Sequence, residues 1–199
     1  MDLAKKSIQK TGQAFLVEGY TDCTMMFKRG YKNTIATLGT ACTIKHLKLI
    51  SNHANKLYVL YDSDSAGKKA IMRLAKLCTD INLDLEILKI PSGQDPASFL
   101  FDEKNDLNLL IADSQDIFTF FINSSAGNNF YSKPLSEKIK LIDDVIGLIC
   151  EIEDSLKKDF LIQKASYVTQ IDCSTLEKII QNHSISNNKK KVVLQGIST

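Results

Sequence analysis

Residues 57–67 read LYVLYDSDSAG, an unbroken apolar run that ends in two aspartates and leads directly into a polar, glycine-containing start of a helix. A short apolar and aromatic run bounded by polar residues is typical of a strand that is buried on both faces. Alternate side chains of a strand share a side, so Asp62 and Asp64 are expected to point the same way just beyond its end. The segment therefore predicts a parallel α/β sheet with two carboxylates at its carboxyl edge.

Two other segments place a carboxylate in the same position. Glu18 follows the apolar residues 14–17, and Asp95 follows the alternating residues 83–90. In open parallel sheets, ligands bind at the carboxyl ends of the strands. Carboxylates gathered there repel one another unless a cation joins them, and a few hard oxygen ligands with room for phosphates describe a Mg²⁺ site. We therefore predict a metal site at this edge.

The spacing of apolar residues divides the chain into a part that alternates strands and helices and a part with helices only. Strands are expected at residues 14–18, 34–37, 57–61 and 83–90, and helices between them at 22–29, 43–53 and 65–78. From about residue 101 the pattern is helical only, with helices expected at 116–123, 134–153, 156–170 and 174–182. We predict an α/β domain over residues 1–105, an all-α subdomain over 106–183 and a disordered polar tail over 184–199.

Turns that follow the strands supply candidate nucleotide or nucleic-acid contacts. Glycines let the backbone approach a phosphate, hydroxyls can bond one, and amides at the start of a helix bind anions. The candidates are Gly19, Asp22, Gly39, Thr40, Ser65, Gly67 and Lys68. Structural alternatives stay open: a first-turn charge for Asp22, helix caps for the two aspartates, an ordinary turn at residues 37–43 and a solvated helix face for Lys68.

Composition bounds the class of protein. The chain has 199 residues, 44% hydrophobic and 24% charged, as expected for a soluble globular protein, and no apolar run reaches membrane-spanning length. Five scattered cysteines without a C-x-x-C pair favour a reducing cytoplasm and argue against a disulfide framework or a zinc site. Residues 1–100 carry 14 basic against 9 acidic side chains, which is compatible with a nucleic-acid partner. No Walker or G-x-G-x-x-G motif is present.

These segments, in this order, resemble the Toprim domain of bacterial DnaG-type DNA primases. The resemblance rests on residues 17–22 (VEGYTD), 36–43 (ATLGTACT), 61–67 (YDSDSAG) and 93–96 (GQDP). The E-G-Y-x-D and L-G-T segments narrow it from Toprim proteins in general to primases and their helicase-linked relatives. It is specific over residues 14–100 and continues more weakly to residue 182, where the helices look like the subdomain that closes the primase polymerase core.

The resemblance implies a DNA-directed RNA polymerase, a nucleotidyltransferase that makes short RNA primers on single-stranded DNA from nucleoside triphosphates. It implies Glu18, Asp62 and Asp64 as catalytic residues and, together with Asp95, as ligands of two Mg²⁺ or Mn²⁺ ions. It also implies the cytoplasm, at the nucleoid and the replication fork, as the location. The partners would be template, primer and nucleotides, and a replicative helicase through a region missing here, but no membrane.

Two departures from the family pattern bear on these expectations. The last motif usually reads D-P-D, whereas here Ala97 replaces the second aspartate. The zinc-binding domain and basic subdomain that precede the Toprim domain in the family are also missing, so we expect a primase fragment or a truncated product, without zinc. The alternatives are another Toprim phosphoryl-transfer enzyme, of topoisomerase or nuclease type, and a non-catalytic nucleic-acid-binding remnant. No tyrosine stands in a context that suggests a topoisomerase.

Overall fold

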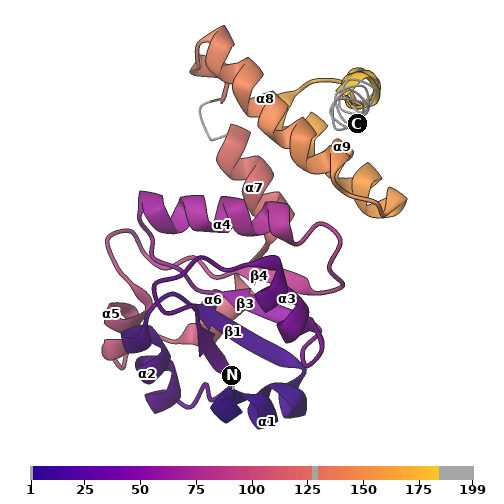
Figure 1. Ribbon diagram of the computed structural model, residues 1–199. Coiled ribbons are helices and arrows are strands. Elements are labelled where there is room, and N and C mark those ends of the chain that lie inside the picture. Colours follow the sequence, from indigo (N-terminus) through magenta and orange to yellow (C-terminus); the bar gives the residue numbers. More distant parts are fainter. Residues whose placement is uncertain (1, 127–129, 184–199) are drawn as a thin grey trace, which may run out of the picture. The chain divides into compact units, whose positions relative to one another are not determined.

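A five-stranded sheet forms the centre of the first part of the chain (Figure 1). Its order is β2-β1-β3-β4-β5, and the first four strands are parallel. The parallel strands are β1 (Gln13–Val17), β2 (Thr34–Ala36), β3 (Lys56–Val59) and β4 (Asp84–Ile87). The edge strand β5 (Gln115–Asp116) pairs with β4 in antiparallel register. The predicted α/β sheet is therefore confirmed, but it is mixed and has one strand more than expected.

The computed structural model describes residues 2–126 and 130–183. Contacts divide the chain into two compact units, Met1–Phe120 and Phe121–Thr199. The predicted boundary after residue 105 differs from this division because α6 (Leu107–Ala112) packs against the core of the sheet and β5 extends the sheet itself. The predicted polar tail, residues 184–199, lies outside the described residues.

Helices connect the strands of the first unit. They are α1 (Asp2–Thr11), α2 (Tyr20–Lys28), α3 (Ile44–Ser51), α4 (Ser65–Leu77), α5 (Pro96–Phe101) and the α6 already given. Local chemistry fixes their starts: the hydroxyl of Thr43 accepts from the backbone N–H of His46, and the Asp64 carboxylate accepts from that of Gly67. The prediction did not include α1, α5, α6 and β5.

The order of the strands creates a switch point between β1 and β3. The chain passes from β1 outward to β2 through α2, and then crosses back over β1 to β3 through α3. Because both crossovers of a parallel sheet are right-handed, two crossovers in opposite directions place α2 and α3 on opposite faces. The connections that leave β1 and β3 therefore diverge, which opens a crevice at their carboxyl ends.

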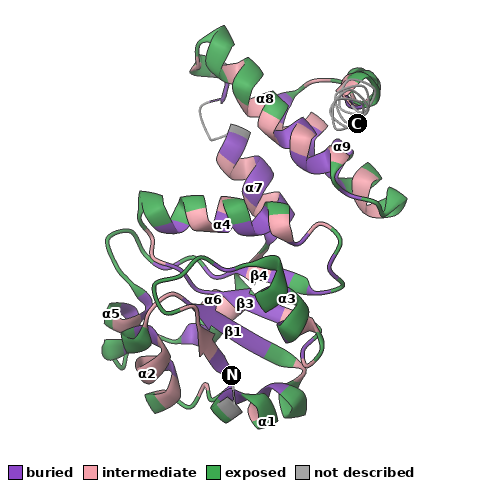
Figure 2. Ribbon diagram, in the orientation of Figure 1, coloured by how far each residue is buried: buried purple, intermediate pink, exposed green. Residues whose placement is uncertain are grey.

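One face of the sheet carries a continuous apolar core. Phe15 and Val17 of β1 pack there with Tyr58 and Leu60, and the ring centroids of Phe15 and Tyr58 lie 5.2 Å apart in a stacked arrangement. Met26 of α2 covers this face together with buried residues of α5 and α6. Figure 2 shows the burial concentrated in the strands, with exposed residues along the outer sides of the helices. The core fixes α2 and α5 against the sheet beside the crevice.

The second unit is helical, as predicted. It contains the end of α7 (Ile117–Ala126), the short 3₁₀ helix η1 (Phe130–Ser132), α8 (Leu135–Cys150) and α9 (Ser155–Thr169), and a further helix covers residues 173–183. The helices α8 and α9 pack on each other, and each buries apolar residues, among them Ile146 of α8 and Ile162 of α9. Over the part of the chain that the structure describes, no helix combines the length and the apolarity needed to cross a membrane.

Candidate active site at the carboxyl edge of the sheet

Glu18 and Asp62 stand on the two sides of the switch point. Glu18 is the first residue after β1, and Asp62 follows the buried residues Leu60 and Tyr61 that continue β3. Leu60 extends the pairing by donating its N–H to the carbonyl of Leu16, which keeps the chain in register up to the aspartate. The topology thus brings together two carboxylates that lie 44 positions apart in the sequence.

The Glu18 carboxylate is half-buried, and its Oε1 is shielded from solvent without a hydrogen-bond partner. Burial raises the pKa of Glu18, and the negative charges of Asp62, Asp64 and Asp22 raise it further, while Arg73 of α4 acts in the opposite direction. A buried carboxylate oxygen without a donor is unfavourable unless something compensates its charge. The surroundings of Glu18 therefore favour a cation or a proton at this oxygen.

Asp62 lies in the same field. Burial raises the pKa of Asp62, followed by the charges of Asp22, Asp95 and Asp64. Asp62 therefore lies within reach of the charges of Asp64 and Asp95, and Glu18 within reach of those of Asp62 and Asp64. Asp22 acts on both. Among the described residues, no three His, Cys, Asp or Glu side chains already form a group that could hold a metal ion. The predicted roles of these acids in metal binding and catalysis stay predictions.

Two of the acids also have structural roles. Asp64 is the N-cap of α4, where its Oδ1 accepts from the N–H of Gly67 at 2.7 Å. Asp95 is the N-cap of α5, where its Oδ1 accepts from the N–H of Ser98 at 2.6 Å; this bond lowers the pKa of Asp95. The capping alternative is thus confirmed for Asp64, and its other oxygen, Oδ2, remains for a ligand, whereas the Asp95 carboxylate also bonds the Ser98 hydroxyl.

Asp22 is the most buried acid of the group, and both of its carboxylate oxygens accept hydrogen bonds from the backbone. Its Oδ2 accepts from the N–H of Gly19 at 2.9 Å, and its Oδ1 accepts from the N–H of Ala97 at 3.2 Å. The first bond holds the turn after β1, and the second joins that turn to the start of α5. The structure therefore indicates that Asp22 positions the motif around Asp95.

The residue between the two aspartates, Ser63, was not predicted to contribute. Its hydroxyl donates to the carbonyl of Gln94 at 2.9 Å and accepts from the N–H of Gly93 at 3.0 Å. These bonds fasten the loop after β3 to the turn before Asp95. The period of two points Ser63 away from the side shared by its neighbours, and this is the one sequence signal that could have suggested a separate role.

The remaining predicted contacts lie around this edge. Gly67 approaches the backbone of the loop after β3 so closely that a Cβ atom would lie 2.2 Å from the carbonyl oxygen of Asp62. Ser65 and Lys68 are exposed on the first turn of α4. At the turn after β2, Gly39 adopts a φ of 73° and the Thr40 hydroxyl donates to the carbonyl of residue 37 at 2.6 Å, which supports the ordinary-turn alternative for Thr40.

The comparisons with known proteins agree with this geometry. A family model described as Toprim-like matches residues 15–100, which contain every acid discussed above. The DNA primase of Aquifex aeolicus (strain VF5) is 32% identical over 200 residues, covering 98% of this chain and 38% of the relative. The chain carries a Toprim domain and is a homologue of DnaG-type DNA primases. It covers between 25% and 38% of the length of three curated primases that it resembles, those of Chlamydia pneumoniae, Clostridium acetobutylicum and Aquifex aeolicus.

Solved primase structures share the fold. The crystal structure of the Aquifex aeolicus primase, comprising zinc-binding and RNA polymerase domains, matches with a TM-score of 0.68 at 29% identity, over 87% of this chain and 41% of that one. A DnaG primase catalytic domain bound to single-stranded DNA matches with a TM-score of 0.73 at 22% identity, over 86% and 56% of the two chains. The second likeness is one of fold alone.

The raised pKa values predict how stability depends on pH. Because folding raises the pKa of Glu18, its ionised form is disfavoured in the folded state. The corresponding stability is present below the unfolded-state pKa of about 4 and is lost as pH rises through the raised value. We expect Glu18→Gln to raise Tm at pH 7 by no more than roughly 2 °C, because solvent screens the charge of a half-exposed carboxylate.

Circular dichroism melting between pH 4 and pH 7 measures this effect, without added divalent metal. The gain in Tm for Glu18→Gln should shrink as the pH approaches 4, since the wild-type carboxyl then becomes neutral as well. Glu103→Gln, an exposed neutralisation in the same unit, is the matched control and should leave Tm unchanged at every pH. An equal gain for both variants would show that net charge, rather than the crevice, is responsible.

Proposed function

We propose that this chain is the metal-binding catalytic part of a DNA primase. It would synthesise short RNA primers on single-stranded DNA from nucleoside triphosphates by Mg²⁺-dependent nucleotidyl transfer. The observation that carries the proposal is the pair of carboxylates at the switch point, with the buried Oε1 of Glu18 lacking any partner. The relatives' names and the solved primase bound to single-stranded DNA support the class of substrate.

The chemistry of these residues suits a divalent cation, although the acids that the structure describes are not yet gathered into a ligand group. Glu18 and Asp62 supply carboxylates without a hydrogen-bond donor among the contacts described, and Asp64 retains one oxygen beyond the cap that it forms. Asp95 would bind through a carboxylate that the backbone and hydroxyl of Ser98 already hold in place. Hard oxygen donors of this kind suit Mg²⁺ or Mn²⁺. When bound, a divalent ion there supplies charge neutralisation for the triphosphate and activation of the attacking 3′-hydroxyl.

The protein's own contribution is positioning. Asp22 and Ser63 tie the three loops of the edge together, so the acids are held by the backbone before any ligand arrives. Preorganised charge and geometry, without a protein nucleophile, are what phosphoryl transfer needs most. Glu18, with its raised pKa, is the acid best placed to accept a proton from the attacking hydroxyl.

The wider setting follows from the same proposal. Template DNA, nucleotides and the RNA primer would be the direct partners, and a replicative helicase would be reached through a part of the protein outside this chain. The site of action would be the cytoplasmic replication fork. A non-catalytic nucleic-acid-binding module is the second candidate, which the loss of a carboxylate at Ala97 favours.

Calorimetric titration with Mg²⁺ and Mn²⁺ tests the proposal, using the wild-type chain and an Asp62→Asn/Asp64→Asn variant. We expect the double substitution to weaken binding at least tenfold, because it removes two of the four proposed ligands. Asp80→Asn/Asp84→Asn, which removes the same charge at the opposite, amino edge of β4, should bind like the wild type. Single-stranded DNA binding that is unaffected by EDTA, with no metal binding, would instead support the non-catalytic module.

A further inference from the structure

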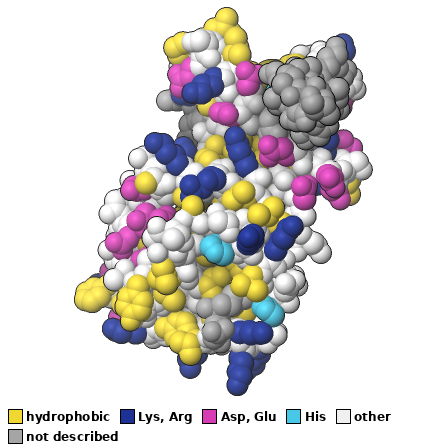
Figure 3. Space-filling model, viewed as in Figure 1, with side chains coloured by type: hydrophobic (Ala, Val, Ile, Leu, Met, Phe, Trp, Pro, Cys, Tyr) yellow, Lys and Arg dark blue, Asp and Glu magenta, His cyan; other side chains and the backbone are white. Residues whose placement is uncertain are grey.

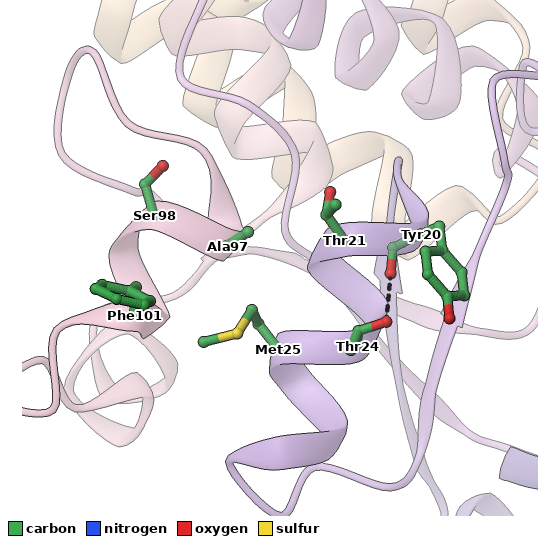
Figure 4. A pocket seen from close by; sticks show the side chains of 7 residues that line it. All are labelled: Tyr20, Thr21, Thr24, Met25, Ala97, Ser98 and Phe101. Atoms are coloured by element: carbon green, nitrogen blue, oxygen red, sulfur yellow. Dashed lines mark hydrogen bonds between the residues drawn. The ribbon is translucent and has the colours of Figure 1, made fainter.

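A groove runs between α2 and α5, directly beside the acidic edge. It has a volume of about 510 Å³, within the range of small-molecule sites. Thr21 and Met25 of α2 form one wall, and Ala97, Ser98 and Phe101 of α5 form the other (Figure 4). The lining is largely apolar and includes no charged side chain. Its occupant should therefore be an uncharged, largely apolar group.

Two residues that line the groove donate backbone hydrogen bonds to acids of the candidate site. The N–H of Ala97 donates to Asp22 Oδ1, and the N–H of Ser98 donates to Asp95 Oδ1. Both helices that form the groove start at the carboxyl edge, α2 after Glu18 and Gly19, and α5 after Asp95. A ligand in the groove can therefore extend one end to the carboxylates.

Two aromatic rings stand exposed at the groove. Phe101 is 80% exposed and Tyr20 is 74% exposed, although apolar rings of this size are usually buried. Figure 4 shows the Phe101 ring on the α5 side, facing Met25, and the Tyr20 ring next to Thr24, on the side of α2 that is turned away from α5. On the side of the molecule where α2 and α5 lie, Figure 3 shows hydrophobic side chains gathered next to acidic ones. The groove thus offers flat apolar surface next to negative charge.

Polar groups at the groove are few and neutral. The Thr21 hydroxyl can donate or accept. The Ser98 hydroxyl bonds the Asp95 carboxylate and can still accept, while the Thr24 hydroxyl donates to the carbonyl of Tyr20 at 2.9 Å. A helix of a partner protein fits poorly, because α5 has six residues and spans only about 9 Å, less than the i to i+7 anchors of a docked helix require. A small planar ring with polar edges fits better.

We propose that the α2–α5 groove binds a nucleobase. The ring stacks on Phe101, its polar edge meets the hydroxyls of Thr21 and Ser98, and the attached phosphate end reaches the acidic edge. This inference rests on the proposed function for the class of ligand, but the base itself needs neither metal nor phosphate to occupy the groove. The base can come from a free nucleotide or from a nucleic-acid strand, which share this chemistry.

Fluorescence titration of a Phe101→Trp variant tests the inference, because the chain contains no other tryptophan. We expect adenosine, which carries no phosphate, to quench the indole saturably in the presence of EDTA. Phe101→Ala should weaken nucleotide binding about tenfold, as the stacking of one base on an aromatic ring implies. Leu109→Ala removes a similarly exposed apolar side chain outside the groove and should leave binding unchanged.

The three ligands distinguish a free nucleotide from a nucleic-acid strand as the source of the base. They also distinguish failure of the groove proposal from failure of the proposed function. Quenching by adenosine and by ATP with Mg²⁺ assigns the base to a free nucleotide, whereas quenching by oligothymidylate alone assigns it to a strand, and either result supports the groove. No quenching by any of the three, with unchanged nucleotide binding by Phe101→Ala, overturns it. Failure of metal binding at Asp62 affects the proposed function but not the adenosine arm in EDTA, so the two ideas fail separately.

Discussion

A Gly67→Ala variant is expected to lose about 2–3 kcal/mol of unfolding free energy and at least tenfold in metal affinity. The added Cβ would lie 2.2 Å from the carbonyl oxygen of Asp62 and 3.2 Å from its backbone nitrogen. Those atoms belong to the backbone, so the clash is relieved only if the loop or the start of α4 moves. Any such movement displaces the Asp62 carboxylate, and an error of about 1 Å strongly reduces the function of a preorganised site.

Gly147→Ala is the matched control for this prediction. Gly147 also lies inside a helix, α8, but its Cβ would meet nothing within 4 Å. Alanine is favoured over glycine in a helix by about 1 kcal/mol, so this variant should be as stable as the wild type or more stable. Denaturant unfolding and metal titration of both variants provide the measurements. Wild-type stability for Gly67→Ala would mean that α4 does not approach the loop this closely in solution.

The sequence predicted the elements whose signals are local. Strand β3 and helix α4 meet at a sharp change from an apolar run to capping chemistry, and the structure confirms both within a few residues. The hydroxyl of Thr43 at the start of α3 is a second example. In each case, the residues that decide the element lie within one turn of its boundary.

Elements that depend on distant partners could not be predicted in this way. Strand β5 has two residues, too few to show a period, and exists because it pairs with β4. Helix α5 has six residues, although Asp95 followed by Pro96 is a recognisable N-cap and first helical position that could have revealed it. The boundary between the units shifts for the same reason, because β5 and α6 belong to the sheet by contact rather than by composition.

The candidate site likewise combines features that the local sequence reveals with features that depend on distant contacts. Carboxylates that follow strands are visible in the sequence, because parallel strands present their carboxyl ends at one edge. The burial of Glu18 Oε1 and the two bonds of the Asp22 carboxylate depend on how loops from three strands pack together. The sequence therefore indicated which acids could meet, whereas the structure shows which of them also hold the loops in place.

Arg29→Met is expected to lower the unfolding free energy by about 2 kcal/mol and to weaken metal binding. From the end of α2, the Arg29 guanidinium donates to the carbonyls of Asn105 at 2.8 Å, Leu100 at 3.2 Å and Asp102 at 3.5 Å. Hydrogen bonds from a charged donor contribute roughly 1.5–3 kcal/mol each when buried, and these are only partly buried. Methionine keeps the aliphatic length but removes every donor.

The bonds of Arg29 matter for the site because they hold the end of α5 opposite to the one that Asp22 holds. Asp22 accepts from the N–H of Ala97 near the start of α5, and Arg29 binds carbonyls at its end and just beyond. Helix α5 is therefore fastened to α2 at both ends, and with it Asp95 and the wall of the groove. Loosening one end should let Asp95 move relative to Asp62.

Two further variants separate positioning from charge. Arg29→Lys keeps the positive charge but loses the planar fork, so it should restore little of the stability or the metal affinity. Lys28→Met removes a charge from the adjacent exposed residue and should change stability by no more than about 0.5 kcal/mol. Denaturant unfolding and metal calorimetry measure both effects. If Arg29→Lys behaves like the wild type, charge alone matters and α5 does not depend on the three carbonyl bonds.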